Sequence, residues 1–323
     1  MRKLEDILHS LHPVLAQLEE ERQLYQKRQR THLLILLLPP LLFAVAGLLL
    51  DVLVIGLILI GIWLIVNLTI YYFRVGKLGS EYVARFKSTV VPALVASIDP
   101  QLQYNQYGGI PAETFVGSEL FTTSPDRYST EDLIQGTYGK TYLQLAEIDA
   151  EERRTRRDSE GNRKTYYVTI FDGLFLIADF HKHFHGRTFI FPDTAEKMFG
   201  NFGRFFQKMG GRSQTNLIRL EDPEFENAFA VYSTDEIEAR YILSTSMMRR
   251  ILDMRNRFGK DIRIGFKASS LVLAVPHAHP FLEPNKSVPA TDPKQVQGML
   301  FELKYFLDTI EELNLNTRIW TKE

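Results

Sequence analysis

The sequence of 323 residues contains no cysteine. This absence excludes disulfide bonds, thiolate nucleophiles and cysteine-ligated zinc sites. An excess of charge of one sign is also lacking, because the formal net charge at pH 7 is −1. A protein without excess positive charge has no overall field that recruits nucleic acid, so such a partner would need a local basic patch.

Charged residues are nearly missing from one long stretch. Between Leu33 and Val66, Asp51 is the only charged residue, and the apolar block continues to Phe73. As a helix, the block would be about 60 Å long, twice the thickness of the hydrocarbon core of a bilayer. We therefore expect a two-helix transmembrane hairpin over residues 31–74, with Asp51 in the turn, because a charge is costly at the bilayer centre.

Basic residues lie on both outer sides of this block, and none lies between the two expected spans. The positive-inside rule then places both termini in the cytoplasm. The basic residues are Arg22, Lys27, Arg28 and Arg30 before the block and Arg74, Lys77, Arg85 and Lys87 after it.

The segments that flank the hairpin are expected to be helical. Residues 1–30 have the pattern of an amphipathic helix with a coiled-coil seam, and residues 75–99 that of a stalk helix with apolar residues every four positions. The first seam consists of Leu4, Ile7, Leu11, Val14 and Leu18, and the second of Leu78, Tyr82, Phe86, Val90 and Leu94. The seams can pair within one chain or join subunits, and the pattern leaves both open. Because an amphipathic helix needs a partner for its seam, we expect a homo-oligomer.

Residues 100–323 are expected to form a cytoplasmic α+β domain in which helices pack on an antiparallel β-sheet. Strand-like runs dominate after Ser129, and Asp172-Gly173 is a tight-turn signal between two of them. The pattern allows two halves, 100–211 and 212–290, and a C-terminal helix over 292–313. The predicted fold class is thus an α+β membrane protein with a transmembrane hairpin, a helical stalk and this domain.

Several short runs in the chain carry a family resemblance. They are Glu131-Asp132-Leu133-Ile134-Gln135-Gly136, Phe171-Asp172-Gly173-Leu174-Phe175, Ala178-Asp179-Phe180, Lys182-His183-Phe184, residues 219–226, Val231-Tyr232-Ser233 and Glu238-Ala239-Arg240-Tyr241. Over residues 70–285 the chain resembles an uncharacterised bacterial family of two-span membrane proteins, catalogued as a domain of unknown function and sometimes labelled galanin-like. The resemblance implies a multi-pass protein of the bacterial inner (plasma) membrane with a cytoplasmic domain, and it implies no activity.

Three histidines alternate at His181, His183 and His185. On a strand their imidazoles would share one face, a geometry that can bind zinc or a similar metal and that would resemble a hydrolytic centre. Gly186 favours a different interpretation, in which the histidines end at a hairpin turn and are solvated. No other cofactor is expected.

A cluster of basic residues surrounds Gly161-Asn162. It is either the solvated tip of a β-hairpin or a surface for anionic lipid headgroups, near which each basic residue contributes about 1 kcal/mol. Nucleic acid is not expected as a partner, because no aromatic residues interleave with the cations. The cluster consists of Arg153, Arg154, Arg156, Arg157, Arg163 and Lys164.

A helix expected over residues 194–209 is a second candidate for contact with the membrane surface. Phe199, Phe202 and Phe206 would lie on an apolar side of this helix, with cations elsewhere. The same pattern is also typical of a helix packed into a protein core.

These features favour a membrane-anchored, non-enzymatic scaffold or binding module that is oligomeric and contacts the lipid bilayer and a protein partner. Two alternatives stay open. One is a lipid-headgroup-sensing module of pleckstrin-like shape, based on the basic cluster. The other is a metal-dependent hydrolase, based on the histidines.

Overall fold

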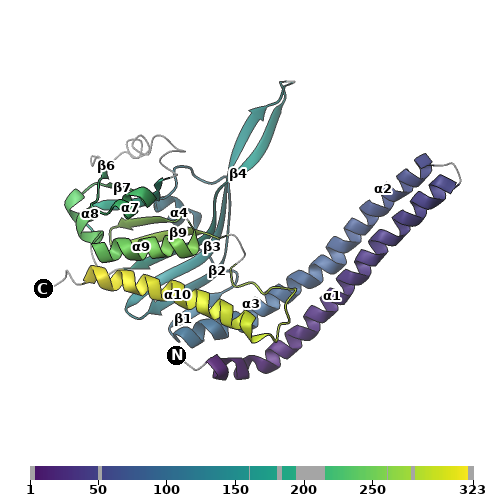
Figure 1. Ribbon diagram of the computed structural model, residues 1–323, viewed down its shortest axis with the longest axis horizontal. Helices are drawn as coiled ribbons and strands as arrows, with labels where there is room; N and C mark the ends of the chain where they lie inside the picture. The colour runs from purple at the N-terminus through teal and green to yellow at the C-terminus, as the bar shows by residue number, and fades with distance from the viewer. Residues whose placement is uncertain are drawn as a thin grey trace. The chain divides into compact units, whose positions relative to one another are not determined.

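The structure is a computed structural model of the chain. It describes residues 4–49, 53–159, 161–179, 184–193, 215–259, 261–277 and 281–318. The fold is α+β, with two long apolar N-terminal helices and a large antiparallel sheet (Figure 1). The chain divides into two compact units, residues 1–94 with 282–300 and residues 95–281 with 301–323. We call these the helical unit and the sheet unit.

The N-terminal part of the chain is almost continuously helical. Its elements are α1 (Leu4–Leu49), α2 (Leu53–Ile70), the π-helix η1 (Tyr71–Gly76) and α3 (Lys77–Ile98). The expected leader helix and first span form one helix, α1, which continues through Pro39 and Pro40. The second span and the stalk helix are likewise continuous, because η1 joins α2 directly to α3.

The apolar parts of α1 and α2 pack closely against each other. A Cβ atom added to Gly56 would lie 3.0 Å from the carbonyl oxygen of Phe43 and 3.6 Å from the Cα atom of Gly47. The outward-facing side chains are apolar and exposed, as Ile65 is at 69%. Both helices are long and apolar enough to cross a membrane. Asp51 lies outside the described residues.

The seams of α1 and α3 are covered within the same chain. The buried seam residues include Ile7, Leu11, Leu18, Tyr82, Phe86 and Val90. Close contact leaves no room for a side chain at Gly79, where an added Cβ would lie 2.9 Å from the ring of Tyr25. Arg85 of α3 also donates to Glu21 of α1. The seams are therefore buried within one chain, and α1 and α3 contact each other beside them. This burial removes the reason from which an oligomer was expected.

A charged cluster joins α1 to the segment that precedes the last helix. Glu19 accepts bonds from Nε and a terminal nitrogen of Arg22 at 2.8 and 2.7 Å, and from the backbone amide of Ala290 at 2.7 Å. Arg22 also donates to the carbonyl of Lys286 at 3.2 Å. The bonds from Arg22 are the largest cause that lowers the pKa of Glu19, which falls to about 2. We call these four residues the Glu19 clamp.

The sheet unit is built on one nine-stranded sheet, in the order β1-β2-β3-β4-β9-β8-β5-β7-β6. The strands are β1 (Leu102–Asn105), β2 (Arg127–Tyr138), β3 (Thr141–Arg157), β4 (Arg163–Asp179), β5 (Arg187–Pro192), β6 (Asn216–Ile218), β7 (Phe229–Ser233), β8 (Arg263–Lys267) and β9 (Ser270–Pro276). All neighbours pair antiparallel. Because β5 pairs with β7 and β8, the sheet joins the two halves that the sequence pattern allowed.

Helices cover both faces of this sheet. They are α4 (Ala112–Gly117), α7 (Pro223–Ala228), α8 (Glu236–Ile242), α9 (Thr245–Phe258) and α10 (Pro293–Arg318). On one face, Phe115 of α4 stacks on Phe121 at 4.6 Å between ring centroids and packs on Phe171 and Phe175. On the other face lie α9 and the part of α10 within the sheet unit (Figure 1).

Strand β4 corrects the expected turn at Asp172-Gly173. The strands expected on either side of this dipeptide form one strand, and the dipeptide lies inside it. Gly173 has φ +152°, and an added Cβ would lie 2.3 Å from the carbonyl oxygen of Val275 on β9. The glycine is required because the neighbouring backbone approaches too closely for a side chain. The prediction of a tight turn was wrong.

Candidate functional site

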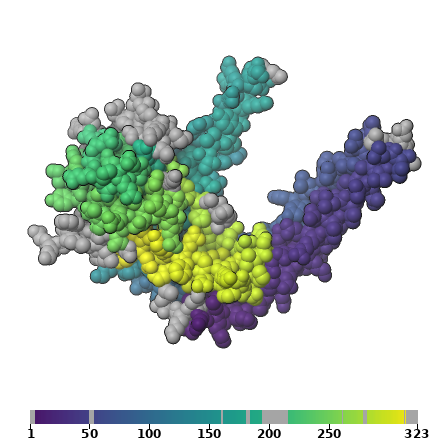
Figure 2. Space-filling view, in the orientation of Figure 1, coloured from purple at the N-terminus to yellow at the C-terminus, as the bar shows by residue number. Residues whose placement is uncertain are grey.

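Strands β3 and β4 extend beyond the rest of the sheet as a two-stranded ribbon. Pairing of β3 with β2 ends at Glu151, and pairing of β4 with β9 begins at Gly173. Beyond these points, residues 152–157 of β3 and residues 163–168 of β4 pair only with each other in the described part of the chain. We call residues 152–168 the arm. In Figures 1 and 2 it projects clear of the rest of the sheet unit.

The arm has two faces, because side chains alternate along a strand and directly opposed residues share a face. Arg153, Arg157 and Arg163 lie on the face that we call the open face, and all three are exposed. Among the residues that the structure describes, no carboxylate pairs with these three guanidinium groups. Arg157 is directly opposite Arg163, and such a like-charged pair is unfavourable without an anion nearby.

The second face of the arm carries acidic partners for its cations. Arg154 forms an ion pair with Glu152 at 3.1 Å, and Lys164 lies 3.8 Å from Asp158. Arg156 is directly opposite Lys164 on this face. The predicted cluster of six basic residues is therefore divided between the two faces, with three residues on each. Acidic partners are found only on the second face, among the residues that the structure describes.

Aromatic side chains in the arm were missed by the sequence reasoning. Strand β4 places Tyr166 opposite Arg154 and Tyr167 opposite Arg153. The guanidinium of Arg127 also lies over the ring of Tyr167, 3.4 Å from its centroid. Pairing the two strands across Gly161-Asn162 would have revealed both tyrosines. The reason given against nucleic acid was thus wrong, and the absence of a nucleic-acid partner stays a prediction.

An acidic cluster lies at the bulge where β2 meets β3. Ligand oxygens of Glu131, Asp132 and Glu147 all lie within 4.8 Å of one another. Asp132 is buried with φ +59° and accepts a hydrogen bond from Tyr104. Glu147 accepts one from the backbone amide of Phe281 at 3.2 Å. Oxygen ligands of this kind suit calcium or magnesium, but acidic groups often gather without an ion, and we assign no metal here.

Two further acids lie directly opposite each other beside this cluster. Asp149 of β3 pairs with Asp172 of β4. Burial, followed by repulsion from Asp172 and Glu151, raises the pKa of Asp149. Glu147, Asp149 and Glu151 lie on the same face of β3 as Arg153 and Arg157. This face is therefore acidic within the sheet and basic in the arm.

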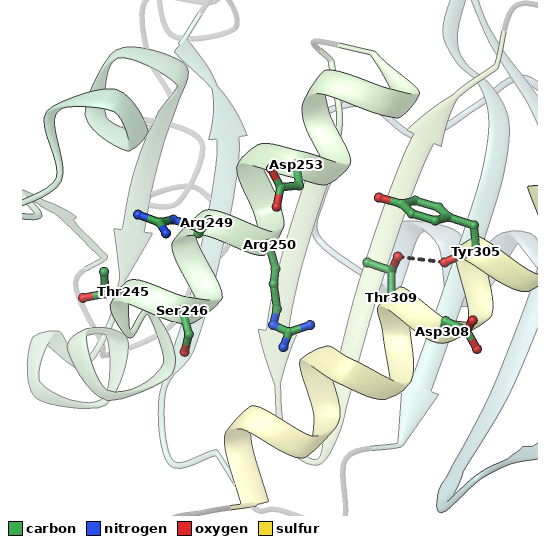
Figure 3. Close-up of a pocket in the computed structure, with 8 residues that line it drawn as sticks. All are labelled: Thr245, Ser246, Arg249, Arg250, Asp253, Tyr305, Asp308 and Thr309. Carbon is green, nitrogen blue, oxygen red and sulfur yellow. Dashed lines mark hydrogen bonds between the residues drawn. The ribbon is translucent and has the colours of Figure 1, made fainter.

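A groove of about 700 Å³ lies between α9 and α10 in the sheet unit (Figure 3). It is lined by Thr245, Ser246, Arg249, Arg250 and Asp253 of α9 and by Tyr305, Asp308 and Thr309 of α10. The sequence reasoning did not find this groove, because its two walls are separated by about fifty residues and the polar residues look like ordinary solvated helix faces.

The histidine and phenylalanine predictions fall largely outside the described residues. His181, His183, Phe199, Phe202 and Phe206 all lie there. His185 is exposed, and its backbone amide donates to Glu238 at 2.9 Å. Metal binding by the three histidines and membrane contact by the phenylalanines stay predictions.

Three comparisons with known proteins were made, and two of them gave a match. Among solved structures, the crystal structure of the mycobacterial trehalose monomycolate transport factor A, TtfA, is similar at 9% identity and a TM-score of 0.27, over 61% of this chain and 93% of that chain. A likeness at this level carries no argument. The search of curated proteins gave no match. Residues 169–315 match the family described as "Protein of unknown function (DUF3137)", so this part of the chain is similar to an uncharacterised domain family, as its resemblance indicated.

Proposed function

We propose that this chain is a membrane-anchored binding module whose arm binds anionic lipid headgroups, without a catalytic step. The observation that carries the proposal is the open face of the arm. Three exposed guanidinium groups lie together on this face, and two of them are directly opposite each other. Anionic headgroups would relieve this repulsion and accept charge-assisted hydrogen bonds from the arginines.

Anchoring is supported by the apolar surfaces of α1 and α2. Leucine and isoleucine side chains along both helices are exposed, although an extended apolar surface of this kind is unfavourable in water. No lysine, arginine or glutamate lies between residues 33 and 73. We infer a two-pass hairpin with both termini in the cytoplasm, where the leaflet carries anionic lipids.

The arm by itself would bind only weakly. Three basic residues at about 1 kcal/mol each give a binding free energy of roughly 3 kcal/mol, whereas a dissociation constant of 1 mM requires about 4 kcal/mol. An anchored chain holds its arm at a high local concentration near the membrane, so weak binding becomes effective. The arm would therefore respond to the headgroup charge of a membrane to which the hairpin is already attached. The proposed headgroup binding is argued from the arm alone. It does not require the pleckstrin-like shape, for which the order of the nine strands gives no support.

The missing cysteine allows a direct test. Ser159 lies exposed beyond the end of β3, so Ser159→Cys creates a single site for an environment-sensitive fluorophore on the full chain. In nanodiscs, we expect blue-shifted emission with anionic lipid, ordinary emission with neutral lipid, and loss of the shift at high salt.

Matched double variants separate the two faces. Arg157→Gln with Arg163→Gln removes two charges that have no acidic partner within the described residues, whereas Arg154→Gln with Lys164→Gln removes two charges that have acidic partners. The first pair should abolish the shift and the second should largely keep it. An equal effect of both pairs, or a shift in neutral lipid, would contradict the proposal. A protein partner and oligomerisation stay predictions of the sequence.

A further inference from the structure

A second groove, of about 380 Å³, lies on the helical unit, where α1 passes η1 and the start of α3. Its lining combines apolar side chains with three cations and one acid. The cations are Arg28 of α1, Arg74 of η1 and Lys77 of α3, and the acid is Glu81 of α3. These elements belong to one compact unit, and the groove is therefore formed within that unit. We call it the basic groove.

The basic groove lies at the level where the apolar block ends. The block runs from Leu33 to Phe73, and Arg74 follows it directly. Arg28 precedes the block by five residues, which is a rise of about 8 Å along a helix. When the hairpin spans a bilayer, this level coincides with the headgroup phosphates, because the polar headgroup region borders the hydrocarbon core.

Two of the three cations keep an unbalanced charge. Lys77 lies 3.7 Å from Glu81 in an exposed pair, so its charge is partly compensated. Arg28 and Arg74 are exposed, and no ion pair links either of them to a carboxylate within the described ranges. Two guanidinium groups that line one groove repel each other, whereas a phosphate between them accepts charge-assisted hydrogen bonds from both.

Contacts beside the basic groove fix the separation of its walls. The rings of His32 on α1 and Tyr71 on η1 are in edge-to-face contact, with 5.4 Å between their centroids. Closer to the N-terminus of α1, a Cβ added to Gly79 of α3 would lie 2.9 Å from the ring of Tyr25. The walls are thus held together on both sides of the two arginines along the helices. In addition, η1 is a π-helix, a rare conformation that is frequent at functional sites.

We propose that the basic groove binds the phosphate group of an anionic phospholipid of the cytoplasmic leaflet. Arg28 and Arg74 hold the phosphate, and the apolar lining contributed by Leu78 covers the less polar part of the headgroup. Basic pockets on the cytoplasmic side of transmembrane helices bind lipid headgroups in this way. A volume of about 380 Å³ is at the small end of the range for ligand sites. This inference rests on the membrane anchoring in the proposed function, but not on the arm.

Native mass spectrometry of the full chain in detergent micelles tests this inference. The probes are phosphatidylglycerol and the zwitterionic phosphatidylcholine, titrated separately. We expect one phosphatidylglycerol molecule to bind about tenfold or more tightly than phosphatidylcholine, which has no net charge. Arg28→Gln with Arg74→Gln should weaken this binding about tenfold or more, because hydrogen bonds between charged groups are lost. Arg74→Lys keeps the charge but loses the planar fork, and should have an intermediate affinity.

Lys27→Gln with Arg30→Gln is the matched control. This pair removes two exposed cations of α1 that flank Arg28 in the sequence but do not line the basic groove. The net charge changes by the same amount, and phosphatidylglycerol should bind as it does to the wild type. Thermal unfolding in detergent checks the fold of each variant, and Arg74→Lys answers the question if the double variant of the groove unfolds.

Several results would overturn the inference. They are equal affinities for the two phospholipids, equal losses for the groove pair and the control pair, and saturation by soluble glycerol phosphate at the same concentrations as by phosphatidylglycerol, which would assign the groove to a soluble ligand. The arm variants should still bind phosphatidylglycerol in the groove, and the groove variants should keep the fluorescence shift at Ser159→Cys. Failure of one site can therefore be told from failure of the other. Release of the chain from membranes by an alkaline wash would contradict the anchoring and with it both proposals.

Discussion

Replacing Glu19 with glutamine tests the Glu19 clamp in the helical unit. Its carboxylate accepts bonds from Arg22 and from the backbone amide of Ala290. Glutamine has nearly the same shape but no charge, so the buried Arg22 loses its counter-ion. The control is Glu20→Gln, one residue along α1, where the side chain is exposed.

The magnitude follows from the pKa of Glu19, which is lowered from 4.5 to about 2. Each pKa unit corresponds to 1.36 kcal/mol, so the carboxylate contributes at most about 3 kcal/mol to the stability of the clamp. The side chain is 14% exposed, and screening by solvent lowers this value, so we expect a loss of about 1–3 kcal/mol.

The sign of the pH dependence follows from a folded pKa below the unfolded one. The stabilisation is fully present above pH 4.5 and is lost as pH falls from there toward 2. Glu19→Gln should lack this stabilisation at pH 7. Because the variant has no carboxylate at position 19, acidification from pH 4.5 to 2 should cause no further loss of stability at this position.

Amide hydrogen exchange on the full chain in detergent measures the effect where it arises. Peptides that cover residues 283–291 should exchange about tenfold or more faster in Glu19→Gln than in wild type at pH 7, since 1.4 kcal/mol is a factor of ten. Glu20→Gln should exchange as wild type does. Equal protection of this segment in wild type and Glu19→Gln would refute the reasoning.

Three further changes test other parts of the structure. Gly173→Ala should destabilise the sheet unit by about 1–3 kcal/mol, because its Cβ would lie 2.3 Å from Val275 O, while Gly117→Ala, which meets nothing within 4 Å, should be neutral in the same denaturation experiment. Glu119→Gln should cost about 1–3 kcal/mol by the same measurement, since its carboxylate pairs with Arg187 at 3.0 Å and Lys267 at 2.6 Å; an unchanged midpoint would remove this network as a source of stability. Gly56→Leu should lower the unfolding temperature in detergent by separating α1 from α2, where a Cβ would lie 3.0 Å from Phe43 O; Gly61→Leu, in open space, is the control.

Local patterns in the sequence were sufficient for several elements. The apolar block predicted two long helices, and α1 and α2 are those helices. The strand-like runs after Ser129 predicted an antiparallel sheet with packed helices, and the sheet unit has this architecture.

The failures share a cause, which is that long-range pairing was not visible. Gly173 was taken for a turn because β9, the strand that crowds its backbone, lies about one hundred residues later in the sequence. The arginines of the arm formed a single cluster in the sequence, whereas strand alternation divides them between two faces.

The sequence by itself determined the apolar hairpin, the α+β class and the presence of a basic cluster, since these depend on composition and local periodicity. Only the tertiary structure decided which arginines have no acidic partner among the described residues, that the seams of α1 and α3 are buried within one chain, and that a polar groove lies between α9 and α10. Each of these depends on which distant segments become neighbours, because a side chain's charge balance and burial are set by its surroundings in space.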